Sequence, residues 1–198
     1  IVLAPGATGG QNILIEASIP LHNLTLNGSA GITATANLMV SPLVLNGNLI
    51  IGTNTVFNTN SINTTFNGNY TNSAGISGYL AGTNLTTFGA LNASSYLGSQ
   101  SLTGATTFFN LLVKPGAMLT VNSPCTILND LTINTGTLAL GSNLMQLRGN
   151  FVNNARYTDA ALANTGIRLN GTIEQRLSGN GNFGRLELDN QYGARIEN

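Results

Sequence analysis

The sequence is unusually poor in charged residues. Only 7% of the 198 residues are charged, against about 25% in ordinary soluble domains, and seven basic residues balance seven acidic ones. A chain with zero net charge and no basic cluster lacks the electrostatic footprint of a protein that binds nucleic acid or anionic lipid. No apolar run approaches the roughly 18 residues that span a bilayer. We therefore expect neither a nucleic-acid partner nor membrane insertion.

Cysteine and histidine are almost absent. Cys125 is the only cysteine, which excludes an internal disulfide and a multi-cysteine metal site; we expect it to be a small buried core residue. His22 is the only histidine, so no second histidine or nearby cysteine could share a metal ion with it. The sequence also lacks the phosphate-binding loop, the dinucleotide fingerprint and the Gly-x-Ser-x-Gly motif. We predict no metal, no cofactor and no catalytic residue.

Asparagine, threonine, serine and glycine supply the polarity that charged residues do not. Asn and Gly favour turns, whereas Thr, Ile and Val favour strands. Short alternating segments such as Leu24-Thr25-Leu26 and Leu43-Val44-Leu45 are separated by Asn-Gly, Ser-Pro and Gly-Thr-Asn. These separators are too frequent for helices, so the pattern predicts an all-β chain of short strands.

A pattern of glycine, phenylalanine and paired aliphatics occurs twice, 75 residues apart. The first copy is Gly104, Phe108, Leu111 and Val113, and the second is Gly179, Phe183, Leu186 and Leu188. A related register occurs a third time around Leu24 and Leu26, and the segments beginning at Gly47 and Gly68 are echoed at Gly136 and Gly149. The order is kept while the spacing drifts, which is typical of stacked units with loops of variable length.

Short strands at this spacing are compatible with a right-handed parallel β-helix or with an antiparallel β-sandwich. Ordered sets of motifs favour the β-helix, in which coils stack about 4.8 Å apart. Equivalent Leu, Ile and Phe side chains then form interior columns, and asparagines form hydrogen-bonded ladders at the corners. We therefore predict a β-solenoid with Asn- and Gly-rich corners, and keep the sandwich as the alternative.

The whole of residues 1–198 reads as one solenoid segment. The N-terminus lacks the basic and apolar regions of a signal peptide, so we expect this segment to belong to a longer chain. Residues 73–100, rich in Gly and Ser, are predicted to form a less regular coil. Residues 155–166 contain the Ala-rich stretch Thr158 to Asn164 and are predicted to be a loop or short helical excursion.

Two alternative functions can be assigned to particular residues. A polysaccharide lyase or glycosidase would need charged side chains to converge in a groove, and the weak candidates for such a site are Arg168, Glu174, Arg176 and Glu187. Ice binding would need a flat threonine array, for which Thr33-Ala34-Thr35, Thr53-Asn54-Thr55 and Thr135-Gly136-Thr137 are the candidates.

Two segments carry a family resemblance. Gln175 to Gly179 followed by Phe183 and Leu186-Glu187-Leu188, together with Gly149 to Asn153, resembles repeat regions of large secreted and cell-surface proteins of Bacteroidota. Such proteins commonly end in a type IX secretion sorting domain. The resemblance implies an extracellular or cell-surface β-helical passenger that acts in adhesion or scaffolding and is not an enzyme. Expected partners are other copies or modules of the same surface protein, the secretion machinery, or surface glycans.

Overall fold

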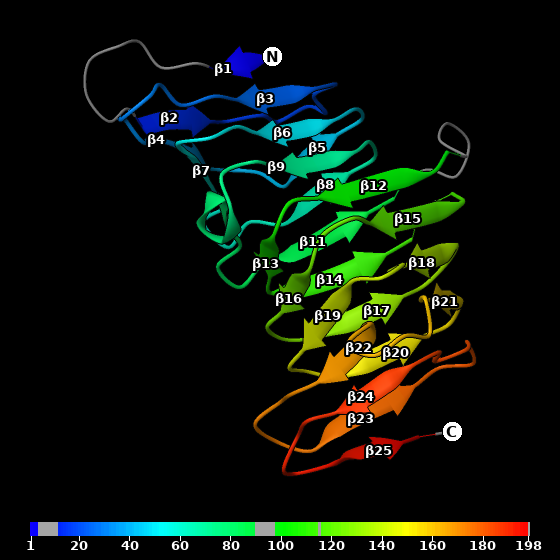
Figure 1. The fold of residues 1–198 in the computed structure, drawn as a ribbon. Helices are drawn as coiled ribbons and strands as arrows, with labels where there is room; N and C mark the ends of the chain where they lie inside the picture. The colour runs from blue at the N-terminus through cyan, green and yellow to red at the C-terminus, as the bar shows by residue number, and fades with distance from the viewer. Residues whose placement is uncertain (4–11, 90–97, 115, 198) are drawn as a thin grey trace.

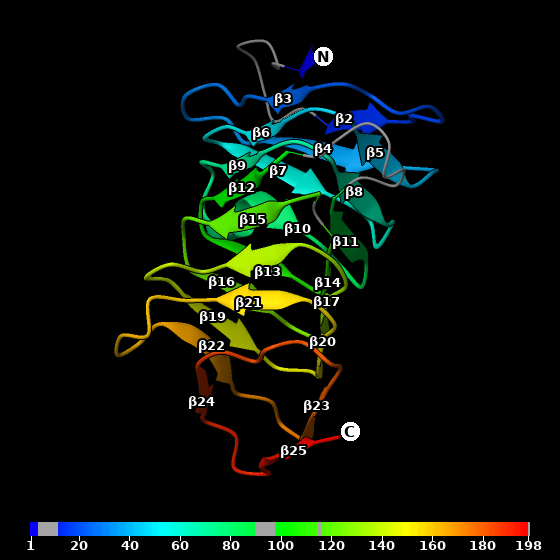
Figure 2. The ribbon, with the colours of Figure 1, turned by 90° about the vertical axis from the view of Figure 1, so that its right-hand side faces the viewer.

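The chain winds into a right-handed parallel β-helix of about eight turns in the computed structural model, as the sequence predicts. The structure describes residues 1–3, 12–89, 98–114 and 116–197. Figures 1 and 2 show the strands stacked along one axis, with the two termini at opposite ends of the rod. Every pairing between the named strands is parallel, so these strands do not form the antiparallel sandwich.

The coils contribute strands to three faces, which we number in chain order. The first face is β1 (Val2–Leu3), β3 (Leu24–Leu26), β6 (Leu49–Ile51), β9 (Tyr70–Asn72), β12 (Gln100–Thr103), β15 (Met118–Val121), β18 (Thr137–Ala139) and β21 (Arg156–Thr158). The second face begins with β2 (Asn12–Ile15), β4 (Ala34–Leu38), β7 (Thr55–Asn58) and β10 (Tyr79–Leu80). It continues, where β10 meets β13, with β13 (Thr106–Phe108), β16 (Cys125–Ile127), β19 (Leu144–Leu147), β22 (Gly166–Leu169) and β24 (Leu186–Leu188).

The third face completes the prism. Its strands are β5 (Leu43–Leu45), β8 (Thr64–Phe66), β11 (Leu85–Phe88), β14 (Asn110–Val113), β17 (Leu131–Ile133), β20 (Phe151–Asn153), β23 (Gln175–Ser178) and β25 (Ala194–Ile196). The single turn of 3-10 helix η1 (Ile76–Gly78) is the one helical element among the described residues. At about 4.8 Å per coil, eight turns make a rod on the order of 40 Å long.

The core is a column of side chains that runs the length of the rod. In most of the three-residue strands the first and third side chains point inward and the second points outward, as in β17, where Leu131 and Ile133 are buried and Thr132 is half-buried. In β18 and β21 the middle side chain, Leu138 or Tyr157, is the buried one. The next coil places Phe151 over Leu131. Each fully buried aliphatic side chain stabilises the fold by about 1.5–3 kcal/mol, and the buried apolar residues form one continuous cluster from Ile15 to Leu177. Stacking therefore holds the coils together without buried ion pairs.

Asparagine ladders occupy two corners of the prism, as the sequence predicts. Where the chain enters the first face, Asn23 Oδ1 accepts the backbone N–H of Asn48 at 2.7 Å, and Asn48 Oδ1 accepts that of Asn69 at 2.8 Å. Where it enters the third face, Asn110 Oδ1 accepts from Asp130 N–H at 3.1 Å, and Asp130 Oδ1 accepts from Asn150 N–H at 2.8 Å. Each ladder side chain satisfies a corner backbone group that has no partner within a strand.

The two copies of the 75-residue repeat occupy different faces, so they are not equivalent coil positions. Leu111 lies on β14 of the third face, whereas its counterpart Leu186 lies on β24 of the second face. The glycines nevertheless share a role. Gly104 and Gly179 both have positive φ, 95° and 103°, and a Cβ on either would collide with a carbonyl oxygen of the preceding coil, that of Asn72 or Asn153. Each copy of the sequence repeat therefore contains a corner glycine that has positive φ and packs closely against the preceding coil.

A buried glutamine also precedes each of these glycines. Gln100 and Gln175 each lie four residues before one of these glycines. Gln100 Nε2 donates to the Phe66 and Gly68 carbonyls at 2.7 and 2.9 Å, and Gln175 Nε2 donates in the same way to the carbonyls of Leu147 and Gly149. Both glutamine amides therefore bond two carbonyls of the preceding coil, where that coil passes from one face to the next.

The burial of the other repeat positions depends on where they lie along the rod. Phe108, Leu111, Val113, Leu24 and Leu26 are buried. At the C-terminal end, Phe183 and Leu186 are only partly buried, and Leu188 is 58% exposed although it lies beside the buried Leu169. The expectation that Leu188 lies in a dry column is wrong, because β24 is the last strand of its sheet.

The two segments predicted to be irregular contain regular strands. Within residues 73–100, β10 and β11 pair in register with neighbouring coils; residues 90–97 lie outside the described part. Within residues 155–166, β21 joins the first face and residues 159–165 form a loop without a helix. Ala161 and Asn164 there have positive φ, 54° and 56°, which is incompatible with continuing a right-handed helix. The helical alternative is therefore wrong.

Candidate functional site

The four charged residues considered for a carbohydrate-active site do not converge. Arg168 on β22 and Glu187 on β24 pair on the second face, with Nη2 and Oε1 3.0 Å apart. Glu174 and Arg176 flank Gln175 at the start of β23 on the third face. The structure thus places the four on two faces of the prism, so the groove that the hypothesis requires is not formed by them.

Glu174 and Arg176 belong to a surface ion-pair network at the C-terminal end. Arg195 contacts Glu197 at 2.8 Å and Glu174 at 3.5 Å, and Arg176 contacts Glu197 at 3.6 Å. These side chains are between 35% and 59% exposed. Exposed pairs of this kind typically contribute about 0–1 kcal/mol, so the network is a solvated surface feature.

The threonine triplets considered for ice binding do not form one flat array. Thr35 points outward from β4 on the second face, but Thr55 points inward and is 2% exposed. Thr137 lies on the first face. Because one candidate faces the core and two others lie on different faces, these triplets do not present a common plane.

The buried titratable groups serve the core. Burial raises the pKa of the Tyr70 and Tyr79 hydroxyls and raises that of the Cys125 thiol from 9.0 to about 12. All three are therefore neutral near pH 7. Tyr79 hydroxyl contacts the Thr64 and Thr86 hydroxyls at 3.0 and 2.8 Å. This arrangement satisfies buried polar groups and gives no sign of acid–base chemistry.

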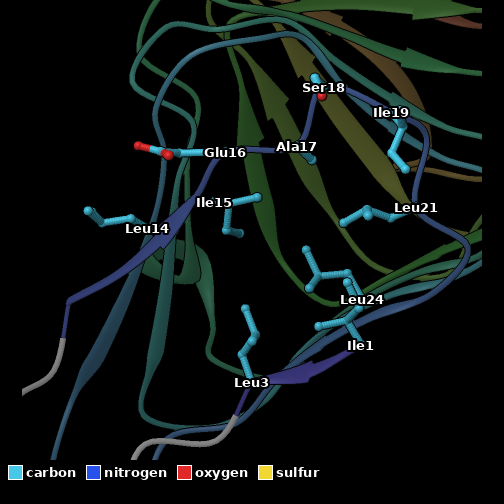
Figure 3. Close-up of a pocket in the computed structure, with 10 residues that line it drawn as sticks. All are labelled: Ile1, Leu3, Leu14, Ile15, Glu16, Ala17, Ser18, Ile19, Leu21 and Leu24. Carbon is cyan, nitrogen blue, oxygen red and sulfur yellow. The ribbon is translucent and has the colours of Figure 1, made fainter.

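An apolar hollow of about 350 Å³ lies at the N-terminal end of the rod. Figure 3 shows Leu3, Ile15, Leu21 and Leu24 around it, with the Glu16 carboxylate directed away. These are inward positions of the first coils, so the hollow is the upper end of the interior column.

A second, polar groove of about 440 Å³ lies at the corner between the second and third faces. Its walls are residues 128–130 and 148–150 of two successive coils and residues 172–175 of the next. Asp130, Arg148 and Glu174 bring ionisable groups to it, and Asn129 and Asn150 bring amides. Of the predicted site residues, only Glu174 lines this groove. This groove is therefore lined by more polar side chains than the apolar hollow at the N-terminal end.

Sequence reasoning missed the groove although a signal was present. Asn110, Asp130 and Asn150 recur every 20 residues, which is the ladder spacing at this corner. The next ladder position, Arg176, comes 26 residues after Asn150. When the separation between successive ladder residues is regular and then becomes longer, the pattern predicts a coil whose corner projects beyond the corners of its neighbours.

Residues 1–3, 12–89, 98–114 and 116–197 contain no group of three or more His, Cys, Asp or Glu side chains placed to hold a metal ion. The same ranges contain no helix long and apolar enough to cross a membrane. Neither finding identifies a cellular location.

Comparison with known proteins finds no matching family model, no similar curated protein and no similar solved structure. The resemblance to Bacteroidota surface proteins therefore stays a prediction.

Proposed function

We propose that this chain is a non-enzymatic structural or adhesive segment of a secreted cell-surface protein, acting as a rigid spacer that also presents a contact surface. The observation that carries the proposal is the stacking of three parallel faces around one apolar column. In such a solenoid each coil contacts only its neighbours, so length is set by the number of coils.

The surface supports the same role. Only 7% of residues are charged, and outward positions such as Thr65, Thr107, Thr126 and Thr132 are threonine. The candidate catalytic side chains are dispersed over two faces. A polar, nearly neutral rod suits a spacer, because it avoids strong attraction to charged macromolecules.

The spacer role is tested by deleting one complete coil. Removal of residues 125–144 joins Pro124 to Met145, which lies directly over Cys125 in the parent fold. We expect the shortened chain to remain folded and its rod to lose about 4.8 Å, one strand spacing. Circular dichroism and small-angle X-ray scattering measure both. Global unfolding of the deletion variant would contradict a modular spacer.

Localisation and catalysis need separate measurements. An antibody against the chain should label intact cells of the source organism, and intracellular staining alone would contradict the surface role. Incubation with a polysaccharide panel should release no reducing ends or unsaturated products. Turnover that disappears in Glu187→Gln or Glu174→Gln would replace the proposal with the lyase or glycosidase alternative.

A further inference from the structure

The polar corner groove exists because one coil widens beside two narrow ones. Leu131 lies four residues after Ile127, and Phe151 four residues after Leu147, so these two corners are tight. In the next coil the equivalent positions Leu169 and Leu177 are eight residues apart. The additional residues form the wall at 172–174, which borders the two narrow corners.

The groove is held in shape by hydrogen bonds. Gln175, 1% exposed, fixes the wide corner to the tight one below it through the Leu147 and Gly149 carbonyls. From the following coil, Asn190 Nδ2 donates to the Ile173 carbonyl at 2.7 Å and to Gln175 Oε1 at 3.0 Å. These bonds hold the wall at residues 173–175 in place before a ligand binds, which lowers the entropic cost of binding.

Several polar groups of the groove have no partner within the described residues. The Arg148 side chain is exposed and makes no ion pair there. Asp130 uses Oδ1 for the Asn150 N–H, and Asn150 uses Oδ1 for the Arg176 N–H at 2.9 Å. Asp130 Oδ2, Asn150 Nδ2 and the Arg148 guanidinium thus offer an acceptor and donors from neighbouring coils.

The chemistry of these groups selects a polyhydroxylated, uncharged ligand. Planar carboxylate, amide and guanidinium groups can each bond two adjacent hydroxyls. The carboxylate of Asp130 balances the charge of Arg148, and Glu174 is paired with Arg195, so no net charge favours an anion. Leu128 and Ile173, 38% and 70% exposed, supply apolar surface for the C–H face of a sugar ring.

We propose that this corner groove binds a neutral saccharide unit of a surface glycan. The proposal rests on the adhesive part of the proposed function and names its contact site and ligand class. The cavity volume falls within the range of about 300–1,000 Å³ typical of small-molecule sites. A free metal ion fits less well, because Arg148 places a positive charge among the oxygen atoms.

Binding is tested by titrating the intact chain with neutral, uronate-containing and sulfated oligosaccharides, followed by calorimetry. We expect saturable binding of a neutral member only. Arg148→Ala and Asp130→Asn should each weaken it about tenfold, the typical effect of losing one hydrogen bond to a charged group. Asp130→Asn keeps an Oδ1 acceptor for the ladder. Arg156→Ala, an exposed arginine on the first face, is the matched control and should bind as the parent does.

Three outcomes would overturn the inference. The first is the absence of binding to any neutral saccharide at 10 mM, which is about the weakest affinity of interest for a monosaccharide site. The second is binding that is unchanged in both groove variants, and the third is selective binding of the anionic oligosaccharides. Melting temperature is measured for every variant, so that loss of binding is separated from loss of fold. If binding fails while the one-coil deletion still shortens a folded rod, the spacer role stands and only the glycan site is rejected.

Discussion

The rod contains two regions that achieve the same stacking by different means. Between β7 and β13 the core is aromatic; its rings are those of Phe57, Phe66, Tyr70, Tyr79, Phe88 and Phe108. Neighbouring ring centroids there lie 5.5–6.5 Å apart, mostly edge to face. Between β14 and β19 the core is mostly aliphatic, built from Leu111, Val113, Leu119, Val121, Ile127, Leu131, Ile133, Leu138 and Leu147, with Cys125 and Met145.

Coil length also differs between the two regions. In the aromatic region stacked residues are 21, 22 or 32 positions apart, as in Leu49 over Tyr70 and Tyr70 over Leu102. In the aliphatic region the interval is 19 or 20, as in Leu119 over Leu138. In both regions the interior must be filled to protein packing density. Rings and buried polar side chains fill the longer coils, and aliphatic side chains fill the shorter ones.

The comparison also shows how register is held. Aliphatic contacts are non-directional, so constant coil length keeps the narrow coils aligned. Where length varies, directional bonds are present instead: Tyr79 hydroxyl contacts Thr64 and Thr86 and accepts from Asn84 Nδ2 at 3.1 Å. Buried polar networks specify one arrangement when every member is satisfied.

The largest expected effect comes from placing a charge in the aliphatic column. Leu111→Asp buries an unpaired carboxylate at a position that is 1% exposed, and should destabilise the fold by about 4–5 kcal/mol or more. Leu188→Asp is the control, because that side chain is 58% exposed. Urea unfolding followed by circular dichroism measures both. Equal losses would mean that the column is not continuous at Leu111.

The next effect tests the directional bonds of the aromatic region. Tyr79→Phe keeps the ring but removes the hydroxyl that Thr64, Thr86 and Asn84 share. Leaving buried polar groups without a partner costs about 1–3 kcal/mol each, so we expect a loss of about 2–3 kcal/mol after partial re-pairing. Tyr192→Phe, at a residue 56% exposed, should change the unfolding midpoint little. A neutral Tyr79→Phe would show that ring packing alone sets the register.

The aliphatic region has its own pH signature through Cys125. Burial raises the pKa of this thiol from 9.0 to about 12, so the folded protein keeps the proton that the unfolded chain releases. Its contribution to stability is therefore fully present below pH 9 and is lost as pH rises toward 12, at up to about 1.4 kcal/mol per pH unit. Stability curves of the parent and Cys125→Ala should converge or cross above pH 9. Parallel curves from pH 7 to 10 would contradict a buried thiol.

A smaller effect is expected at the corner ladders, which serve both regions. Asn48→Ala removes the acceptor for the Asn69 N–H and should cost about 1 kcal/mol. Asn48→Asp restores an acceptor, as Asp130 does naturally in the other ladder, and should recover most of that loss. Thermal melts of both variants decide the point. Equal melting of the Ala and Asp variants would mean that the ladder bond adds no stability.

The smallest effect concerns the charged surface, most of which lies in the C-terminal part. Glu187→Gln breaks the pair with Arg168 on the second face. Both side chains are partly exposed, at 25% and 34%, so the loss should be about 0.2–1 kcal/mol and should shrink in high salt. A loss above about 2 kcal/mol that persists in 1 M salt would indicate a buried pair instead.

Much of the fold was open to prediction because it depends on local pattern. Alternation in segments such as Leu131-Thr132-Ile133 places two side chains inward and one outward, and Asn-Gly separators place corners. The echo of Leu49 at Leu138 keeps the same face, since both lie on the first face, but not the same register. Leu49 stacks through Tyr70 and Leu102 on Val121, whereas Leu138 pairs with Leu119, two positions earlier. The echo of Leu111 at Leu186 does not keep the face, because Leu111 lies on the third face and Leu186 on the second.

The sequence by itself determined the class of fold, the inward columns and the ladder residues, because periodicity and side-chain chemistry act over a few neighbouring positions. Only the tertiary structure decided which coils lie over one another and which loops overhang them. That choice separates Arg168 and Glu187 from Glu174 and Arg176, and brings Asp130 and Arg148 beside Glu174. Which residues become neighbours depends on the summed lengths of all the coils between them. A short sequence segment does not contain that information.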